Sequence, residues 1–158
     1  MKSLASAAAL SIRHVRNRLQ TLPMTLVATY DEAMQRIMSQ DSEHKDIAFK
    51  TLAWISYAFR SLSLRELQHA LAIEPEDPEL DEELIMDGRS ITALCAGLVT
   101  IDPGTDAVNL VHYTARKYFE DKREVYFPGF HGNITLSCAT YLTMPALHNA
   151  TIWKIVKT

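Results

Sequence analysis

Histidines and cysteines are the side chains of this sequence that could hold a metal ion or act as nucleophiles. No two histidines have the His-Glu-x-x-His spacing of a zinc peptidase, and the two cysteines lie too far apart for a zinc-ligand pair. Cys95 and Cys138 lie in the apolar segments ITALCAGLV and ITLSCATYL, so we expect two buried free thiols in a reducing compartment. His69 falls within a predicted helix, where we expect it to be partly exposed. These residues predict neither a metal centre nor a nucleophilic site.

Motifs for phosphate binding and acyl transfer are also missing from the sequence. None of the five glycines is followed by lysine, so there is no phosphate-binding loop. There is no Gly-x-Ser-x-Gly nucleophile turn either. We therefore expect a protein that is not an enzyme and that holds no cofactor of its own.

Composition and charge are those of one domain of ordinary size. The 158 residues are 47% hydrophobic and 22% charged, which suits a packed core rather than a disordered chain. A net charge of -3 gives no general attraction for nucleic-acid phosphates. The sequence has no apolar run of about 18 residues, so no membrane span is predicted.

The stretch Thr51–Ile73 organises the predicted fold. A helix that is apolar on most sides belongs in the middle of a core, and the first half of this stretch carries Leu52, Trp54, Ile55, Tyr57 and Phe59. Ser63 and Glu66 then have the spacing of a capping box, in which each side chain accepts a bond from the other residue's backbone amide. A second helix is thus predicted over Leu64–Ile73.

The other predicted elements surround this helix pair. Side chains that can cap a helix stand at Thr25, at Asp41 or Ser42, and at Ser90. Gly97 supplies a left-handed stop, and Pro103-Gly104 is typical of a hairpin turn between two β-prone runs. The predicted helices cover residues 25–39, 42–58, 64–73, 91–96, 113–122 and 133–143, and the predicted strands cover 98–102 and 107–112.

This order of elements predicts a mainly α fold of the winged-helix type, with a three-helix core, a small antiparallel β-hairpin and flanking helices. We divide the chain into an N-terminal segment (1–22), a winged-helix domain (23–125) and a C-terminal helical extension (126–158). Residues 1–22 contain no acid, as in a mitochondrial presequence, but their apolar residues also form one helical stripe. We expect the end of a helix from a larger upstream domain and a cytoplasmic location, with mitochondrial targeting as the alternative.

A winged helix raises the question of nucleic-acid binding. The recognition element would be Ser90–Val99, which contains no Arg, Lys, Asn or Gln to contact a base edge. Arg89 alone precedes it, while Asp102 and Asp106 in the hairpin turn would repel phosphates. We do not expect nucleic-acid binding, although it stays the alternative function.

Several blocks of the sequence resemble a known family. The blocks are Leu22–Ile37, LAWISYAFRSLSLRELQHALAIEP (Leu52–Pro75), CAGLVTID (Cys95–Asp102), NLVHYTARKYFE (Asn109–Glu120) and LSCATYL (Leu136–Leu142). They resemble the winged-helix segment of fungal NACHT–ankyrin (STAND-type) proteins, which is named the GPI inositol-deacylase winged-helix domain. The name implies no lipase chemistry here, because the nucleophile motif is missing.

The resemblance implies a regulatory and protein-interaction module in a signal-transducing NTPase. In such proteins the segment follows a nucleotide-binding NACHT module and precedes ankyrin or similar repeats. This chain carries neither, so the resemblance suggests a truncated relative whose partner would be a NACHT-type module or a repeat domain.

One residue role comes with the resemblance. The block around His112 is similar to the position where related receptors use a histidine, at the end of the hairpin, to contact the phosphates of the bound nucleotide. An imidazole at the end of a strand can donate a hydrogen bond to a phosphate. His112 is therefore a candidate phosphate sensor, but only with a NACHT partner. The alternative is a hydrogen-bonded structural residue between the hairpin and the next helix.

Overall fold

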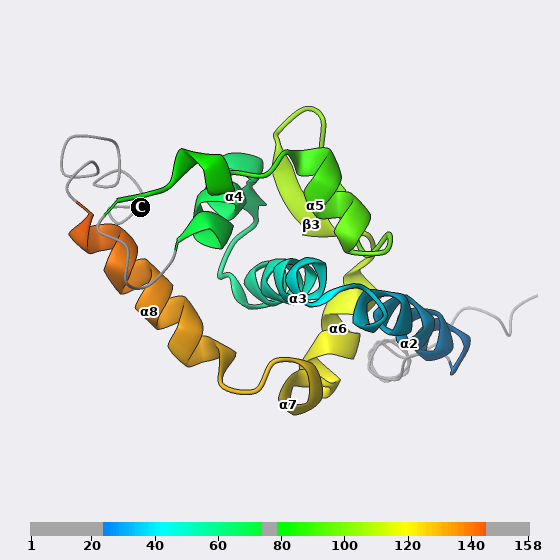
Figure 1. Ribbon diagram of the computed structural model, residues 1–158. Coiled ribbons are helices and arrows are strands. Elements are labelled where there is room, and N and C mark those ends of the chain that lie inside the picture. The colour runs from blue at the N-terminus through cyan, green and yellow to red at the C-terminus, as the bar shows by residue number, and fades with distance from the viewer. Residues whose placement is uncertain (1–23, 74–78, 145–158) are drawn as a thin grey trace, which may run out of the picture.

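The computed structural model describes residues 24–73 and 79–144 (Figure 1). The described helices are α2 (Met24–Met38), α3 (Ser42–Tyr57), α4 (Leu64–Ala72), the 3-10 helix η1 (Glu82–Leu84), α5 (Gly88–Leu94), α6 (Tyr113–Asp121), α7 (Arg123–Tyr126) and α8 (Phe130–Thr143). The strands are β1 (Leu62–Ser63), β2 (Val99–Ile101) and β3 (Ala107–Leu110). The predicted N-terminal segment 1–22 lies outside the described residues. In the described part, no helix combines the length and the apolar character needed to cross a membrane.

The sheet has three antiparallel strands in the order β1-β3-β2, so the predicted two-stranded hairpin is incomplete. The hairpin itself pairs Val99 with Leu110 and Ile101 with Val108. The additional strand pairs Leu62 with Val108. The prediction missed β1 because two residues are too short to show the alternation by which a strand is recognised.

The elements α3, β1, α4, α5, β2 and β3 follow one another as a winged helix, which confirms the predicted fold class. Figure 1 shows α3 in the middle of the molecule, with α4, α5 and α6 around it. One core joins the elements, as the fully buried side chains Leu52, Leu67, Ile91, Cys95, Val108 and Phe119 show. The predicted packing of the helices at 64–73 and 91–96 into a shared core is therefore confirmed.

Two of the predicted helix caps are present and two are wrong. Thr25 does not cap α2, because that helix already begins at Met24. Asp41 caps α3 by accepting a bond from the amide of His44 at 3.0 Å. The capping box of α4 is complete, with 3.3 Å from the Glu66 amide to Ser63 Oγ and 2.9 Å from the Ser63 amide to Glu66 Oε2. Helix α5 is capped by Asp87 instead of Ser90, because its carboxylate accepts bonds from the next two amides after Gly88.

Two side chains predicted to be buried are exposed. Phe59 is fully exposed, because α3 ends at Tyr57 and the turn that leads into β1 takes Phe59 out of the helical register. Cys138 is exposed on α8, whereas Cys95 is buried as predicted. Helix α8 begins at Phe130, three residues earlier than expected, and none of its residues is buried. Apolar spacing within α8 therefore did not indicate burial.

Candidate functional site

The junction between strand β3 and helix α6 contains the one residue for which the sequence suggested a binding role. The last pairing of β3 is a bond from the Val111 amide to the Leu98 carbonyl at 2.9 Å. His112 follows with extended backbone, φ -149° and ψ 145°, and is the N-cap of α6. Its Nδ1 accepts the Thr114 amide at 3.3 Å. The ring thus does what an Asp or Ser side chain does at most helix starts.

Two buried hydroxyl groups continue from this cap into the core. The Thr114 hydroxyl lies 2.7 Å from His112 Nδ1 and 2.6 Å from the phenol oxygen of Tyr30 on α2. Thr114 is 6% exposed and Tyr30 is 5% exposed, so both hydroxyls are shielded from water. The imidazole is therefore connected by hydrogen bonds to a helix 84 residues earlier in the chain.

A pocket of about 220 Å³ opens beside His112. Its lining residues are Ile55, Ser61, Val108, Asn109, Leu110, His112, Tyr113 and Arg116. Arg116 lies one helical turn after His112 and donates from Nη2 to the carbonyl of Ile55 at 3.4 Å. No described carboxylate forms an ion pair with Arg116. A guanidinium and an imidazole on one rim suit an oxyanion such as phosphate.

The polar wall of the pocket is tied to the sheet. Ser61 Oγ donates to Asn109 Oδ1 at 2.9 Å, which joins the turn before β1 to β3. The ring of Tyr113 lies against that of His112, with centroids 4.5 Å apart. These contacts hold the pocket walls in place independently of a ligand.

Both interpretations of His112 fit this geometry. Nδ1 makes the local bonds that a structural residue would make, and no described residue bonds Nε2. Sequence reasoning missed Arg116, although its spacing of four residues from His112 places it on the same helix face. Thr114 has a similar local signal, but nothing in the sequence pattern connects Tyr30 with this junction.

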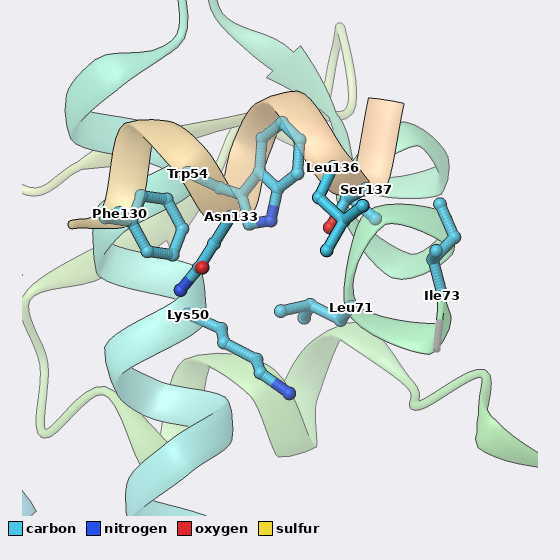
Figure 2. A pocket seen from close by; sticks show the side chains of 9 residues that line it. Lys50, Trp54, Leu71, Ile73, Phe130, Asn133, Leu136 and Ser137 are labelled. Atoms are coloured by element: carbon cyan, nitrogen blue, oxygen red, sulfur yellow. The ribbon is translucent and has the colours of Figure 1, made fainter. Parts of the chain in front are cut away.

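A second concave surface, the α8 groove, lies between α8 and the helix pair α3–α4 (Figure 2). It measures about 250 Å³ and is lined by Lys50, Trp54, Ala70, Leu71, Ile73, Phe130, Asn133, Leu136 and Ser137. The rings of Trp54 and Phe130 meet edge to face, with centroids 6.3 Å apart. Near the other end of α8, His69 Nδ1 lies 3.0 Å from the hydroxyl of Tyr141. His69, predicted to be partly exposed, is half-buried, and this burial lowers its pKa, with a smaller effect from Arg65.

The surface that a DNA-binding winged helix would use is not basic. Among the exposed residues of α5 is Arg89, which follows Asp87. At the hairpin tip, Asp102 accepts bonds from the amides of Gly104 and Thr105. These bonds and the one from the Thr105 hydroxyl, which has the largest effect, lower the pKa of Asp102. The tip therefore carries a fixed negative charge that phosphates would meet first.

The chain was compared with protein families, curated proteins and solved structures. A model of the family described as GPI inositol-deacylase, winged helix domain, matches residues 35–128. This range is more than half of the chain and includes His112, Thr114 and Arg116, whereas Tyr30 and α8 lie outside it. No curated protein and no solved structure matches. The chain belongs to the GPI inositol-deacylase winged-helix domain family.

Proposed function

We propose that this protein is a non-catalytic regulatory and protein-interaction module of a NACHT-type signal-transduction NTPase. Its partner is a NACHT-type nucleotide-binding module or the repeat domain of such a protein. The observation that carries the proposal is the pocket beside His112, where an imidazole and the guanidinium of Arg116 share one rim.

The pocket supports a role in which the phosphates come from the partner. At about 220 Å³ it is small for a whole nucleotide, for which ligand sites usually have 300 Å³ or more. An acceptor oxygen of a nucleotide held by the neighbouring module could reach the donors at the rim. The winged helix would then act as a clamp that closes on the module only while those phosphates are present.

The proposal assigns no covalent chemistry to the chain. Burial raises the pKa of the Cys95 thiol to about 12. A thiol with this pKa stays protonated at neutral pH and is a poor nucleophile. Cys138, although exposed as a residue, also has its pKa raised by partial burial of the sulfur.

Binding to a purified NACHT module tests the proposal. We expect the complete chain to bind, in the presence of ADP, a module taken from a protein in which it adjoins a winged helix of this family. His112→Ala should weaken binding about tenfold or more, since a hydrogen bond to a charged group contributes about 1.5–3 kcal/mol. Calorimetric titration measures this. No binding of the wild-type chain would overturn the proposal.

Two matched variants separate the imidazole from the helix cap. His112→Asn keeps a side-chain oxygen that can cap α6 but removes the ring, so it should bind as weakly as His112→Ala. His131→Ala removes an imidazole on α8, and binding should be unchanged. If His112→Asn bound as well as the wild-type chain, the weaker binding of His112→Ala would be due to loss of the helix cap. That result would contradict a contact between the imidazole and a phosphate.

Nucleic-acid binding is the competing function, and its signature is a steep dependence on salt. A titration with duplex DNA at low salt should show no such binding, because Arg89 follows Asp87 on α5 and the hairpin tip carries Asp102 and Asp106. Binding that falls steeply as salt rises would favour a DNA-binding winged helix instead.

The proposed location is the cytoplasm, with mitochondria as the alternative. Imaging a fluorescent fusion of the whole chain, with and without residues 1–22, distinguishes the two. A mitochondrial signal that depends on residues 1–22 would contradict the cytoplasmic location.

A further inference from the structure

A chain of three hydrogen-bonded side chains runs from helix α2 to the pocket rim, through Tyr30, Thr114 and His112. We propose that Thr114 and Tyr30 are positioning residues that hold the neutral imidazole of His112 as its Nε2–H tautomer, with this N–H as the donor available at the pocket. The use of that donor rests on the proposed function. The tautomer itself follows from the geometry of the free chain.

The backbone amide of Thr114 sets the role of Nδ1. An amide N–H can only donate, and this one points at Nδ1 over 3.3 Å. Nδ1 must then present its lone pair. A neutral imidazole carries one proton, which therefore lies on Nε2. The helix cap therefore requires this tautomer, because a proton on Nδ1 would point at the amide proton of Thr114 and the cap could not form.

The hydroxyl groups point in the same direction. With Nδ1 as an acceptor, the Thr114 hydroxyl proton makes the bond of 2.7 Å and shares the one Nδ1 lone pair with the more distant amide. That hydroxyl has no second proton, so the bond of 2.6 Å to Tyr30 must be donated by the phenol. All protons are thus ordered from Tyr30 through Thr114 to His112. Because both hydroxyls are buried, water does not compete for these bonds.

Tyr30 is itself held from two directions. Its ring packs on that of Tyr118, with centroids 5.2 Å apart. The Tyr118 phenol donates to the carboxylate of Asp31, the next residue of α2, at 2.6 Å. Two adjacent positions of α2 are therefore fastened to α6, which places the Tyr30 hydroxyl within reach of Thr114. A shift of α2 relative to α6 would move the Tyr30 phenol away from Thr114 and so remove the first donor of the hydrogen-bonded series that ends at His112.

This arrangement also limits the ligand. Nε2–H and the Arg116 guanidinium both donate, so the rim suits a group that only accepts, such as a phosphate or another oxyanion. A group that itself donates, such as an amide N–H, would face these protons and be disfavoured.

Nitrogen NMR of the complete chain, labelled with ¹⁵N-histidine in mildly alkaline buffer, reads the tautomer directly. We expect His112 to show the shift pattern of the Nε2–H form in the absence of nucleotide or partner. Thr114→Val keeps the volume and removes the hydroxyl, and should change the tautomer ratio about fivefold toward Nδ1–H, the equivalent of one hydrogen bond. Tyr30→Phe should change it less, in the same direction.

Two further variants exclude a general effect on the fold. Thr114→Ser restores a hydroxyl and should restore the wild-type pattern. Tyr126→Phe removes a phenol that bonds Tyr118 at 3.0 Å but bonds none of Tyr30, Thr114 and His112. It should leave the tautomer ratio of His112 unchanged. A wild-type His112 with Nδ1–H or an even mixture, or a Thr114→Val protein that is folded and keeps the wild-type ratio, would overturn the proposal. If the tautomer holds while the NACHT module does not bind, the positioning role stands and the proposed function fails.

Discussion

The hairpin–α6 junction and the contact between α8 and α4 both bring a histidine against aromatic side chains, yet they are built in opposite ways. At the junction, His112 caps a helix and is bonded to the buried hydroxyl of Thr114, which in turn is bonded to that of Tyr30. At the contact between α4 and α8, the ring of His69 makes one bond, to Tyr141. The junction belongs to the common core through Val108 and Phe119. Helix α8 has no buried residue and meets the rest of the molecule mainly through aromatic edges.

This difference indicates where the stability of the molecule lies. Opening the junction would break bonds between buried polar groups and expose fully buried side chains, so it should require unfolding of the core. Separating α8 would expose surface that is only partly buried, apart from Met144 at its C-cap, which is 2% exposed. We therefore expect the winged-helix body to open as one unit, and α8 to detach from it at a much smaller cost.

One cysteine lies in each region, and the rates at which a reagent labels the two thiols should show the largest difference between the regions. Cys138 lies exposed on α8, and Cys95 is 0% exposed at the end of α5. In native buffer, a thiol reagent should label Cys138 about a thousandfold faster or more, because Cys95 reacts only after the body opens, and global stability is about 5–15 kcal/mol. Mass spectrometry of timed samples measures both rates. Cys138→Ser should abolish the fast phase alone. Similar labelling rates at the two cysteines would contradict the view that α8 detaches while the winged-helix body stays closed.

Truncating one leucine in each region should separate them by stability. Leu67 on α4 is fully buried, whereas Leu136 on α8 is about half exposed, at 51%. Leu67→Ala should lower the free energy of unfolding by about 3 kcal/mol, and Leu136→Ala by about 0.5 kcal/mol or less. Urea titrations followed by circular dichroism give both values. Equal losses would mean that α8 is part of the cooperative body.

The same contrast separates what the sequence could predict from what it could not. The capping box at Ser63 and Glu66 and the hairpin around Pro103-Gly104 depend on residues within a few positions of one another. Their physical causes are therefore visible in the sequence. The cap of α5 is also local, but the prediction began this helix at Ile91 and so placed the cap at Ser90, whereas the helix begins at Gly88 and is capped by Asp87.

Long-range features could not be predicted in this way. Strand β1 exists because β3 offers it a partner, and the bond between Tyr30 and Thr114 spans 84 residues. Whether an apolar helix face is covered depends on the distant segments packed against it, so Cys138 was wrongly predicted to be buried. The position of His112 at the strand end followed from the local pattern, whereas the hydroxyl groups that orient its ring did not.

Acid should weaken the body through Glu66. The bond from Arg60, opposed by burial, lowers the pKa of this carboxyl to about 2, with a further contribution from the Ser63 amide. Since the folded pKa lies below the ordinary value, the stabilisation is present above about pH 4.5 and is lost as the pH falls toward 2. We estimate about 1 kcal/mol after solvent screening. Glu66→Gln keeps a capping side chain and should flatten the pH dependence of urea unfolding in this window. The control is Glu32→Gln, which removes the exposed partner of Arg36 and should leave this pH dependence unchanged.

The bond between His69 and Tyr141 gives the smallest effect, and it tests the attachment of α8 alone. Tyr141→Phe removes the hydroxyl that lies 3.0 Å from His69 Nδ1 and keeps the ring. Because the bond is partly exposed, its loss should cost about 0.5–1 kcal/mol. Hydrogen exchange should then speed up about twofold to fivefold for α8 amides and stay unchanged for those of α4 and α5. Leu142→Ala, which alters a side chain that is 54% exposed on the same helix, is the matched control and should leave both sets unchanged. If Tyr141→Phe accelerated exchange in α4 and α5 equally, α8 would be coupled to the core, and the contrast between the two regions would be wrong.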